Sequence, residues 1–212
     1  MTSLHIGFLI YPGVTQLDAT GPAQVLSRLP NAIIHMVWKD LQPVSTDAGF
    51  SINPTDTFES CPQLDVICVP GGFGQRVLMD DADTLAFLRG QAGGARYITS
   101  VCSGSLLLGA AGLLYGYKSA CHWAFLDSLR MFGAEPVAER VVRDRNRITG
   151  GGVTAGIDFG LTLAAELAGD DIARAIQLFL EYNPQPPFDA GSPDRAGPEL
   201  EARVRKLIEL AG

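Results

Sequence analysis

The sequence predicts a single α/β domain in which helices cover both faces of a mostly parallel sheet. Its 212 residues are a common length for one such domain. Strand-like apolar runs alternate with helical patterns, and this alternation is typical of parallel sheets. Apolar residues make up 47% of the chain and charged residues 18%, so a sizeable core is expected and global disorder is not. In such sheets, sites form at the carboxyl ends of the strands.

The alternation can be assigned element by element. Apolar runs of strand length predict strands at Leu4–Ile10, Ile33–Trp38, Asp65–Val69, Tyr97–Val101, Pro136–Val142 and Asn146–Thr149. Helical spacing predicts helices at Gly21–Leu29, Asp81–Gln91, Ser103–Leu113, Trp123–Met131, Thr154–Ala168 and Asp170–Tyr182. Pro22 would stand in the first turn of its helix. Residues 44–58 should form short irregular strands, and residues 183–198 are too rich in proline for a helix or a central strand.

Charge and hydropathy patterning limit the class of partner. The net charge of −7 argues against binding to nucleic acid or to an anionic membrane, because both need a basic face. No stretch reaches the roughly 18 to 20 apolar residues of a membrane span, and the N-terminus lacks the pattern of a signal peptide. Four cysteines without framework or zinc-site spacing favour reduced thiols in the cytoplasm. A small neutral or hydrophobic ligand is expected.

Cys102 is the strongest candidate for a catalytic residue. It lies in TSVCSGSLLLGAAGLL, residues 99–114, where a predicted strand runs into a helix through small residues. This is the arrangement of a nucleophile elbow with cysteine in place of serine. The N-terminal N–H groups of the helix should favour the thiolate and lower the pKa of Cys102. The alternative is an ordinary buried thiol.

The other cysteines are weaker candidates for the nucleophile. Cys68 lies inside a predicted strand, which suits a buried structural thiol, and Cys61 has no visible activator. Cys121 lies beside His122 but does not follow a central strand at the start of a helix.

A nucleophilic thiol needs a proton partner. Among the three histidines, His122 is the one in a segment that could return to the strand ends. Asp18, in YPGVTQLDATGP, follows the turn after the first strand and should lie over the same edge of the sheet. Taken alone, an aspartate before a proline-led helix is more typical of a helix cap, and the two roles can coexist.

Two glycine runs follow predicted strands. Backbone N–H groups of PGGFG, residues 70–74, could stabilise an anion near Cys102, and the run lacks the ending of a phosphate-binding loop. TGGGVTAG, residues 149–156, is typical of tight turning and close packing, with a wall of the pocket as a second possible role.

These motifs resemble one protein family. PGGFG, SVCSGSLLLGAAGLL, HWA and TGGGVTAGID, in this order, are similar to the PfpI-type superfamily related to class I glutamine amidotransferases. Within it, QLDATGP, RVVRD and EYNPQPPFDAGSP look most like the isocyanide hydratase branch. The resemblance covers Ile6 to about Asp194. It implies a flavodoxin-like three-layer sandwich, a homodimer and no metal or organic cofactor.

The resemblance also implies roles for individual residues. Cys102 matches the family nucleophile, and Asp18 matches the carboxylate that hydrogen-bonds it, where much of the superfamily has glutamate. Gly72 and Ser103 match the pair of backbone N–H groups that bind an oxyanion, although Ser103 stands where threonine is expected. Val153 stands where the hydratases tend to have isoleucine. His122 lies near the histidine of triad-bearing relatives, and hydratases do not depend on it.

The implied reaction adds water to an isocyanide and releases an N-substituted formamide. Cys102 would attack the terminal carbon while Asp18 donates a proton, which gives a thioimidate, and water activated by Asp18 would then release the thiol. Apolar residues around Trp123, Val153 and Phe188 would suit a hydrophobic substituent.

Two other functions share the same features. One is a ligand-sensing module like those of regulators with a helix-turn-helix tail, which need a further DNA-binding domain that the sequence up to Gly212 does not suggest. The other is a glyoxalase, deglycase or stress protein of the same fold, against which Asp18 and the EYNPQPPFDAGSP segment weigh.

Overall fold

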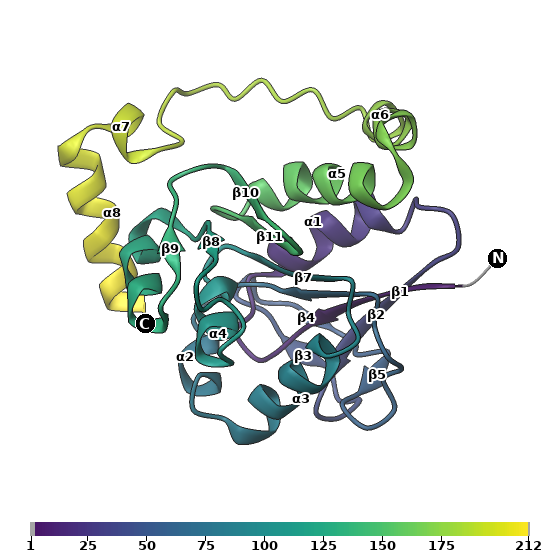
Figure 1. Ribbon diagram of the computed structural model, residues 1–212. Coiled ribbons are helices and arrows are strands. Elements are labelled where there is room, and N and C mark those ends of the chain that lie inside the picture. The colour runs from purple at the N-terminus through teal and green to yellow at the C-terminus, as the bar shows by residue number, and fades with distance from the viewer. Residues whose placement is uncertain (1–2, 212) are drawn as a thin grey trace.

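The protein is a three-layer α/β sandwich, as the computed structural model shows for residues 3–211 (Figure 1). A seven-stranded sheet forms the middle layer. Its order is β10-β11-β7-β6-β1-β2-β5, with bounds Val141–Asp144, Arg147–Gly150, Tyr97–Val101, Val66–Val69, Leu4–Leu9, Ala32–Trp38 and Asp56–Thr57. All neighbours pair in parallel except β10 and β11, which are antiparallel. The predicted fold class is confirmed.

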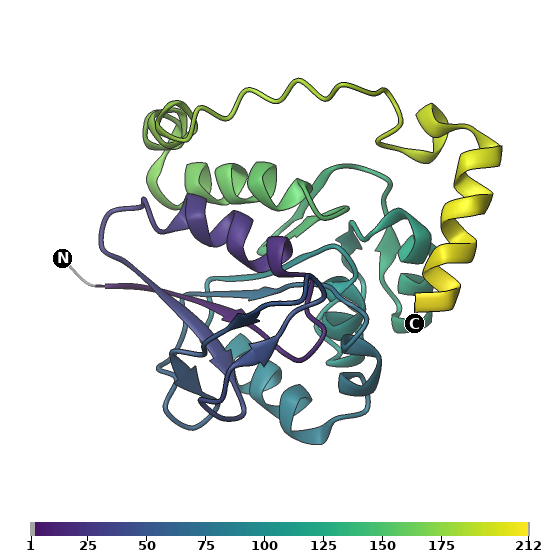
Figure 2. The same cartoon turned by 180° about the vertical axis from the view of Figure 1, so that it is seen from behind.

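Two helices pack on one face of the sheet, α1 (Gln16–Leu26) and α5 (Ala155–Ala168). They approach closely because α5 carries glycine where α1 presents side chains: a Cβ at Gly156 would lie 3.1 Å from Pro22, and one at Gly160 would lie 3.0 Å from Val25. The expected close packing through the TGGGVTAG run is therefore present. A third helix, α6 (Asp170–Phe179), packs on the outer side of α5 (Figure 2).

The opposite face carries α2 (Gln75–Leu78), α3 (Ala82–Ala92) and α4 (Gly104–Ala110), followed by the 3-10 helix η1 (Trp123–Phe132). Asp81 caps α3, because its side chain accepts the N–H of Thr84 at 2.9 Å. The small pairs β3 (Val44–Ser45) with β4 (Ser51–Ile52) and β8 (Lys118–Ser119) with β9 (Glu135–Pro136) complete the domain. The short strands expected within residues 44–58 are present.

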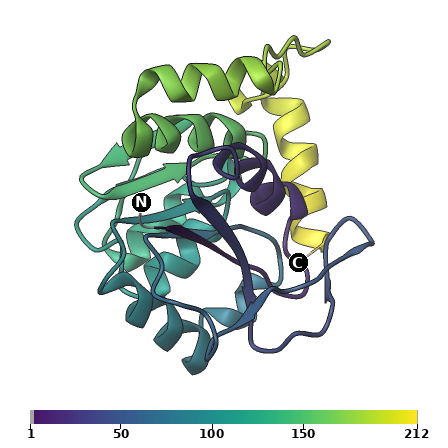
Figure 3. The ribbon, with the colours of Figure 1, turned by 90° about the vertical axis from the view of Figure 1, so that its right-hand side faces the viewer.

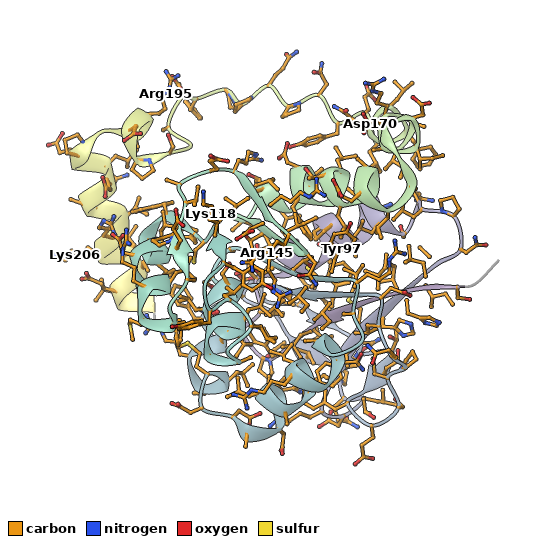
Figure 4. The ribbon with its side chains drawn as sticks, viewed as in Figure 1. Tyr97, Lys118, Arg145, Asp170, Arg195 and Lys206 are labelled. Carbon is orange, nitrogen blue, oxygen red and sulfur yellow. The ribbon has the colours of Figure 1, made fainter. Side chains whose placement is uncertain are left out.

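The C-terminal region differs most from the prediction. After α6 the chain crosses the molecule as an exposed extended segment, residues 183–192 (Figure 1). It then forms α7 (Pro193–Ala196) and α8 (Pro198–Ala211), and α8 is the yellow helix along the side of the domain in Figure 3. The last helix predicted from the sequence ends at Tyr182, so α8 is not among the predicted elements. The side chains of Arg195 and Lys206 extend outward from these helices (Figure 4). Within residues 3–211, no helix is long and apolar enough to cross a bilayer.

The start of α1 was also predicted wrongly. The helix begins at Gln16, five residues before the predicted Gly21, so Pro22 lies inside it rather than in its first turn. Proline cannot donate the hydrogen bond that would reach the carbonyl of Asp18 four residues earlier, and the helix forms because its apolar face is buried. The consequence is that Asp18 belongs to the first helical turn and is held rigidly.

The contact between α4 and the end of β6 is too close for a side chain at Gly104. A Cβ there would overlap the carbonyl oxygens of Val69 and Pro70, which are backbone atoms and cannot move aside cheaply. We expect Gly104→Ala to lower the free energy of unfolding in urea by about 1–3 kcal/mol. The control is Gly90→Ala in the exposed part of α3, where a Cβ would meet nothing within 4 Å. This substitution should raise the free energy of unfolding by about 0.5–1 kcal/mol, because alanine favours the helix more than glycine does. Equal effects of the two changes would contradict this account.

Candidate active site

Cys102 lies at a strained turn between β7 and α4. Its φ angle is +61°, in the left-handed region that non-glycine residues rarely adopt. Its N–H donates to the carbonyl oxygens of Gly151 at 2.7 Å and Gly150 at 3.1 Å, which hold the turn against β11. The side chain is 6% exposed and borders a cavity. The predicted elbow geometry is therefore present.

Asp18 is fully buried beside this turn. Its Oδ2 accepts the N–H of Gly71 at 2.8 Å, whereas its Oδ1 has no hydrogen-bond partner. No side-chain hydrogen bond caps α1, whose N-cap residue is Thr15, so the capping role considered for Asp18 is wrong. The first turn of α1 instead directs the carboxyl group toward Cys102 and the glycine run after β6.

Burial controls the protonation of Asp18. Loss of water raises the pKa of its carboxyl group to about 7, while the Gly71 N–H and the Cys102 side chain oppose the rise and the charge of Asp47 adds to it. A carboxyl group with this pKa can both donate and accept a proton near neutral pH.

The expected lowering of the Cys102 pKa is wrong. Burial raises the pKa of the thiol well above its ordinary value, and the nearby Asp18 carboxylate raises it further. The N–H of Ser103, at the start of α4, lowers the pKa but does not offset burial. The two groups therefore lie in one desolvated pocket that favours their neutral forms.

The PGGFG run, residues 70–74, packs against Asp18 and the turn that carries Cys102. Gly72 donates its N–H to Ser103 Oγ at 3.2 Å, and a Cβ at Gly71 would lie within 2.9 Å of both Ser103 and Asp18. Two further bonds fix the run: Tyr11 donates its hydroxyl to Pro70 O at 2.8 Å, and Thr15 donates its N–H to Gly71 O at 2.9 Å. The glycines thus allow the backbone to approach both side chains.

A cavity of about 320 Å³ opens above Cys102 and Ser103. Its apolar walls are Phe73, Met79, Leu106, Phe125, Val153 and Ile208. Its polar walls, besides Cys102 and Ser103, are Thr15, Asp47, Gln75, Arg76 and His122. The cavity therefore suits a small ligand with a hydrophobic substituent.

The structure brings most of the predicted site residues together. Cys102, Gly72, Ser103, Val153 and His122 all border the cavity, and Asp18 lies behind Gly71.

His122 accepts the N–H of Ala124 at 3.3 Å, and burial lowers its pKa, so it is neutral near pH 7. Two residues expected around the substituent lie elsewhere. The ring of Trp123 borders a second, smaller hollow and stacks on Arg205, and Phe188 is 80% exposed.

Three residues that line the cavity come from helices that the sequence did not predict: Gln75 and Arg76 from α2, and Ile208 from α8. Ile208 comes from α8, whose pattern PELEARVRKLIELA, with proline at the first turn and acidic residues after it, is typical of a helix start. Gln75 comes from the four-residue helix α2 and carries no sequence signal that separates it from an ordinary surface glutamine.

The remaining thiols and imidazoles lie outside the cavity walls. All four cysteines are free, and burial raises the pKa of Cys121 to about 12. His5 and His35 hydrogen-bond each other at 2.9 Å between β1 and β2. Across residues 3–211, no group of three His, Cys, Asp or Glu side chains is arranged as metal ligands would be.

The raised pKa of Asp18 makes stability depend on pH. Between about pH 4, where the unfolded carboxyl titrates, and pH 7, the folded protein binds the proton that the unfolded chain releases, so stability falls as the pH rises. We expect Asp18→Asn to remove this dependence when urea unfolding is compared at pH 4.5 and 7.5. The control is Asp127→Asn, whose side chain is 94% exposed. A pH dependence unchanged from wild type in Asp18→Asn would contradict the assignment.

Curated relatives of the chain include an enzyme and regulators. The isonitrile hydratase of Pseudomonas putida is 59% identical over 96% of this chain and 90% of its own length. The HTH-type transcriptional regulator GbdR of Pseudomonas aeruginosa is 32% identical over 84% of this chain, and the match spans 50% of the regulator.

Solved structures show the same fold. A THiJ/PfpI family protein from Pseudomonas syringae has a TM-score of 0.95 at 50% identity, covering 99% of this chain and 87% of that chain. DJ-1beta of Drosophila melanogaster has a TM-score of 0.78 at 22% identity, covering 86% and 100%. The DJ-1/PfpI family model matches residues 5–166. The chain belongs to the DJ-1/PfpI family.

Proposed function

We propose that the protein is an isocyanide hydratase, a hydro-lyase that converts an organic isocyanide and water to an N-substituted formamide. One observation carries the proposal: the buried Asp18 carboxyl group lies beside the Cys102 thiol, which itself borders a cavity with largely apolar walls. The 59% identity to the isonitrile hydratase of Pseudomonas putida supports it, since isonitrile is a synonym of isocyanide.

The first step joins the substrate to Cys102. The sulfur forms a bond to the terminal carbon of the isocyanide, and the same carbon takes up a proton, which gives the thioimidate R–N=CH–S–Cys102. The raised pKa values of both groups keep this proton in the pocket at neutral pH, so no external acid is needed. Asp18 donates this proton to the carbon and takes up the proton that the Cys102 thiol releases as the carbon–sulfur bond forms, so Asp18 ends the step protonated.

The second step consumes water. The water oxygen bonds to the thioimidate carbon while Asp18 gives its proton to the nitrogen and takes one proton from the water. The carbon–sulfur bond then breaks, the sulfur recovers a proton from Asp18, Asp18 takes up the proton of the added hydroxyl, and the formamide R–NH–CHO leaves. The N–H groups of Gly72 and Ser103 stabilise the oxygen that is added, once the Ser103 hydroxyl turns away from Gly72. Neither step requires a metal or an organic cofactor.

The enzyme acts as a homodimer in the cytoplasm under this proposal. Apolar side chains on α6 and the extended segment support a second copy as partner, because Leu178, Phe179 and Phe188 are 81%, 67% and 80% exposed.

The nucleophile is tested by following the loss of the isocyanide stretch in the infrared with cyclohexyl isocyanide. We expect Cys102→Ala to abolish turnover, because the carbon–sulfur bond cannot form. The matched control is Cys121→Ser, which alters a neighbouring buried thiol outside the cavity walls and should leave turnover intact. Absence of turnover by folded wild type would refute the proposal and make methylglyoxal the next compound to test.

The proton carrier is tested by comparing Asp18→Asn with His122→Ala. We expect Asp18→Asn to lower kcat by about 10²- to 10⁴-fold, because the amide cannot exchange the proton. His122→Ala should cost less than about tenfold, since its imidazole already accepts a backbone N–H and is neutral. Equal losses in the two variants, measured in the same infrared assay, would assign the proton transfer to His122.

A further inference from the structure

Gln75 is a buried polar side chain in the wall of the cavity. Its side chain is 4% exposed, and its Oε1 atom has no hydrogen-bond partner. Among the described residues that border the cavity, Gln75 is the one with a buried side-chain atom left unpaired. Ser103, the other buried polar wall residue besides Cys102, already accepts the N–H of Gly72.

An unpaired buried acceptor costs free energy, so its presence in a substrate cavity indicates a ligand that donates a hydrogen bond. Rotation about the last side-chain bond of glutamine is nearly free and can turn Oε1 or Nε2 toward the cavity. The apolar walls offer no other buried partner of this kind. The hydrogen-bond donor for Gln75 is therefore one of the reactants.

An isocyanide carries no N–H or O–H donor, whereas the second reactant, water, carries two. A water molecule buried among apolar walls needs two to four polar partners to stay in place. We propose that the Gln75 carboxamide binds the water molecule that hydrolyses the thioimidate, a role that rests on the proposed function. Gln75 accepts one hydrogen of this water and Asp18 takes the other as the oxygen bonds to carbon.

A glutamine that binds the hydrolytic water predicts a different change in the kinetic constants from one that binds the isocyanide. The value of kcat/KM reports the steps up to the thioimidate, whereas kcat also includes its hydrolysis. We expect Gln75→Met, which keeps the length of the side chain and removes its amide, to lower kcat and KM together by about tenfold or more. The value of kcat/KM for cyclohexyl isocyanide should stay within about twofold. Mass spectrometry of the quenched enzyme should show the covalent adduct on Cys102 accumulating.

The matched control is Thr84→Val in α3. Thr84 is also fully buried with an unpaired side-chain oxygen, but it does not border the cavity. Its replacement should leave kcat, KM and the adduct level unchanged. Gln75→Met should unfold at a urea concentration no lower than wild type, because it removes an amide whose buried oxygen has no partner. If Gln75 served folding alone, the variant would unfold at a lower urea concentration than wild type.

Several outcomes would overturn the proposal. An unchanged kcat in Gln75→Met would do so, as would a fall in kcat/KM without accumulation of the adduct. If Gln75→Met does not fold, Gln75→Asn keeps the amide on a shorter stem, and the same fall of kcat at constant kcat/KM is expected. Turnover by wild type is measured first, so its absence would count against the hydratase function rather than against the role of Gln75.

Discussion

The hydrogen bond from the Gly71 N–H to the buried Asp18 carboxylate is the interaction on which the site depends. It joins the loop after β6 to the first turn of α1, and Thr15 strengthens this join by donating to the Gly71 carbonyl. The loop can come this close only because Gly71 and Gly72 carry no side chain. The same approach brings the Gly72 N–H to Ser103, so one packing constraint places the acid, the backbone donors and the nucleophile turn.

Burial and hydrogen bonding act against each other on the pKa values of this site, and burial is the larger effect. The start of α4 favours the thiolate of Cys102, but the pocket excludes water from both the thiol and Asp18 and raises both pKa values. For a reaction that transfers a proton to carbon in its first step and consumes a water in its second, a protonated pair is useful. At rest, the site therefore holds a neutral thiol and a protonated Asp18 that can supply the proton for the isocyanide carbon, and it does not hold a preformed thiolate.

The cavity walls come from parts of the chain that are far apart. The turn between β7 and α4 supplies the nucleophile, η1 and the residue that caps its start supply Phe125 and His122, and α8 closes the cavity with Ile208. An apolar enclosure suits a hydrophobic substituent and also strengthens every polar interaction inside it. In this enclosure the unpaired Oε1 atom of Gln75 is the group to which the reacting water would donate.

The sequence by itself determined the alternation of strands and helices, the strand Tyr97–Val101 and the position of Cys102 after it, because apolar period and turn residues are local signals. It also indicated Asp18, although not its place inside a helix. Only the tertiary structure decided the protonation of Asp18 and Cys102, since desolvation depends on every element packed around a group. The same holds for Gln75, whose significance lies in the partner it lacks, and a missing partner is a property of packing that no local pattern records.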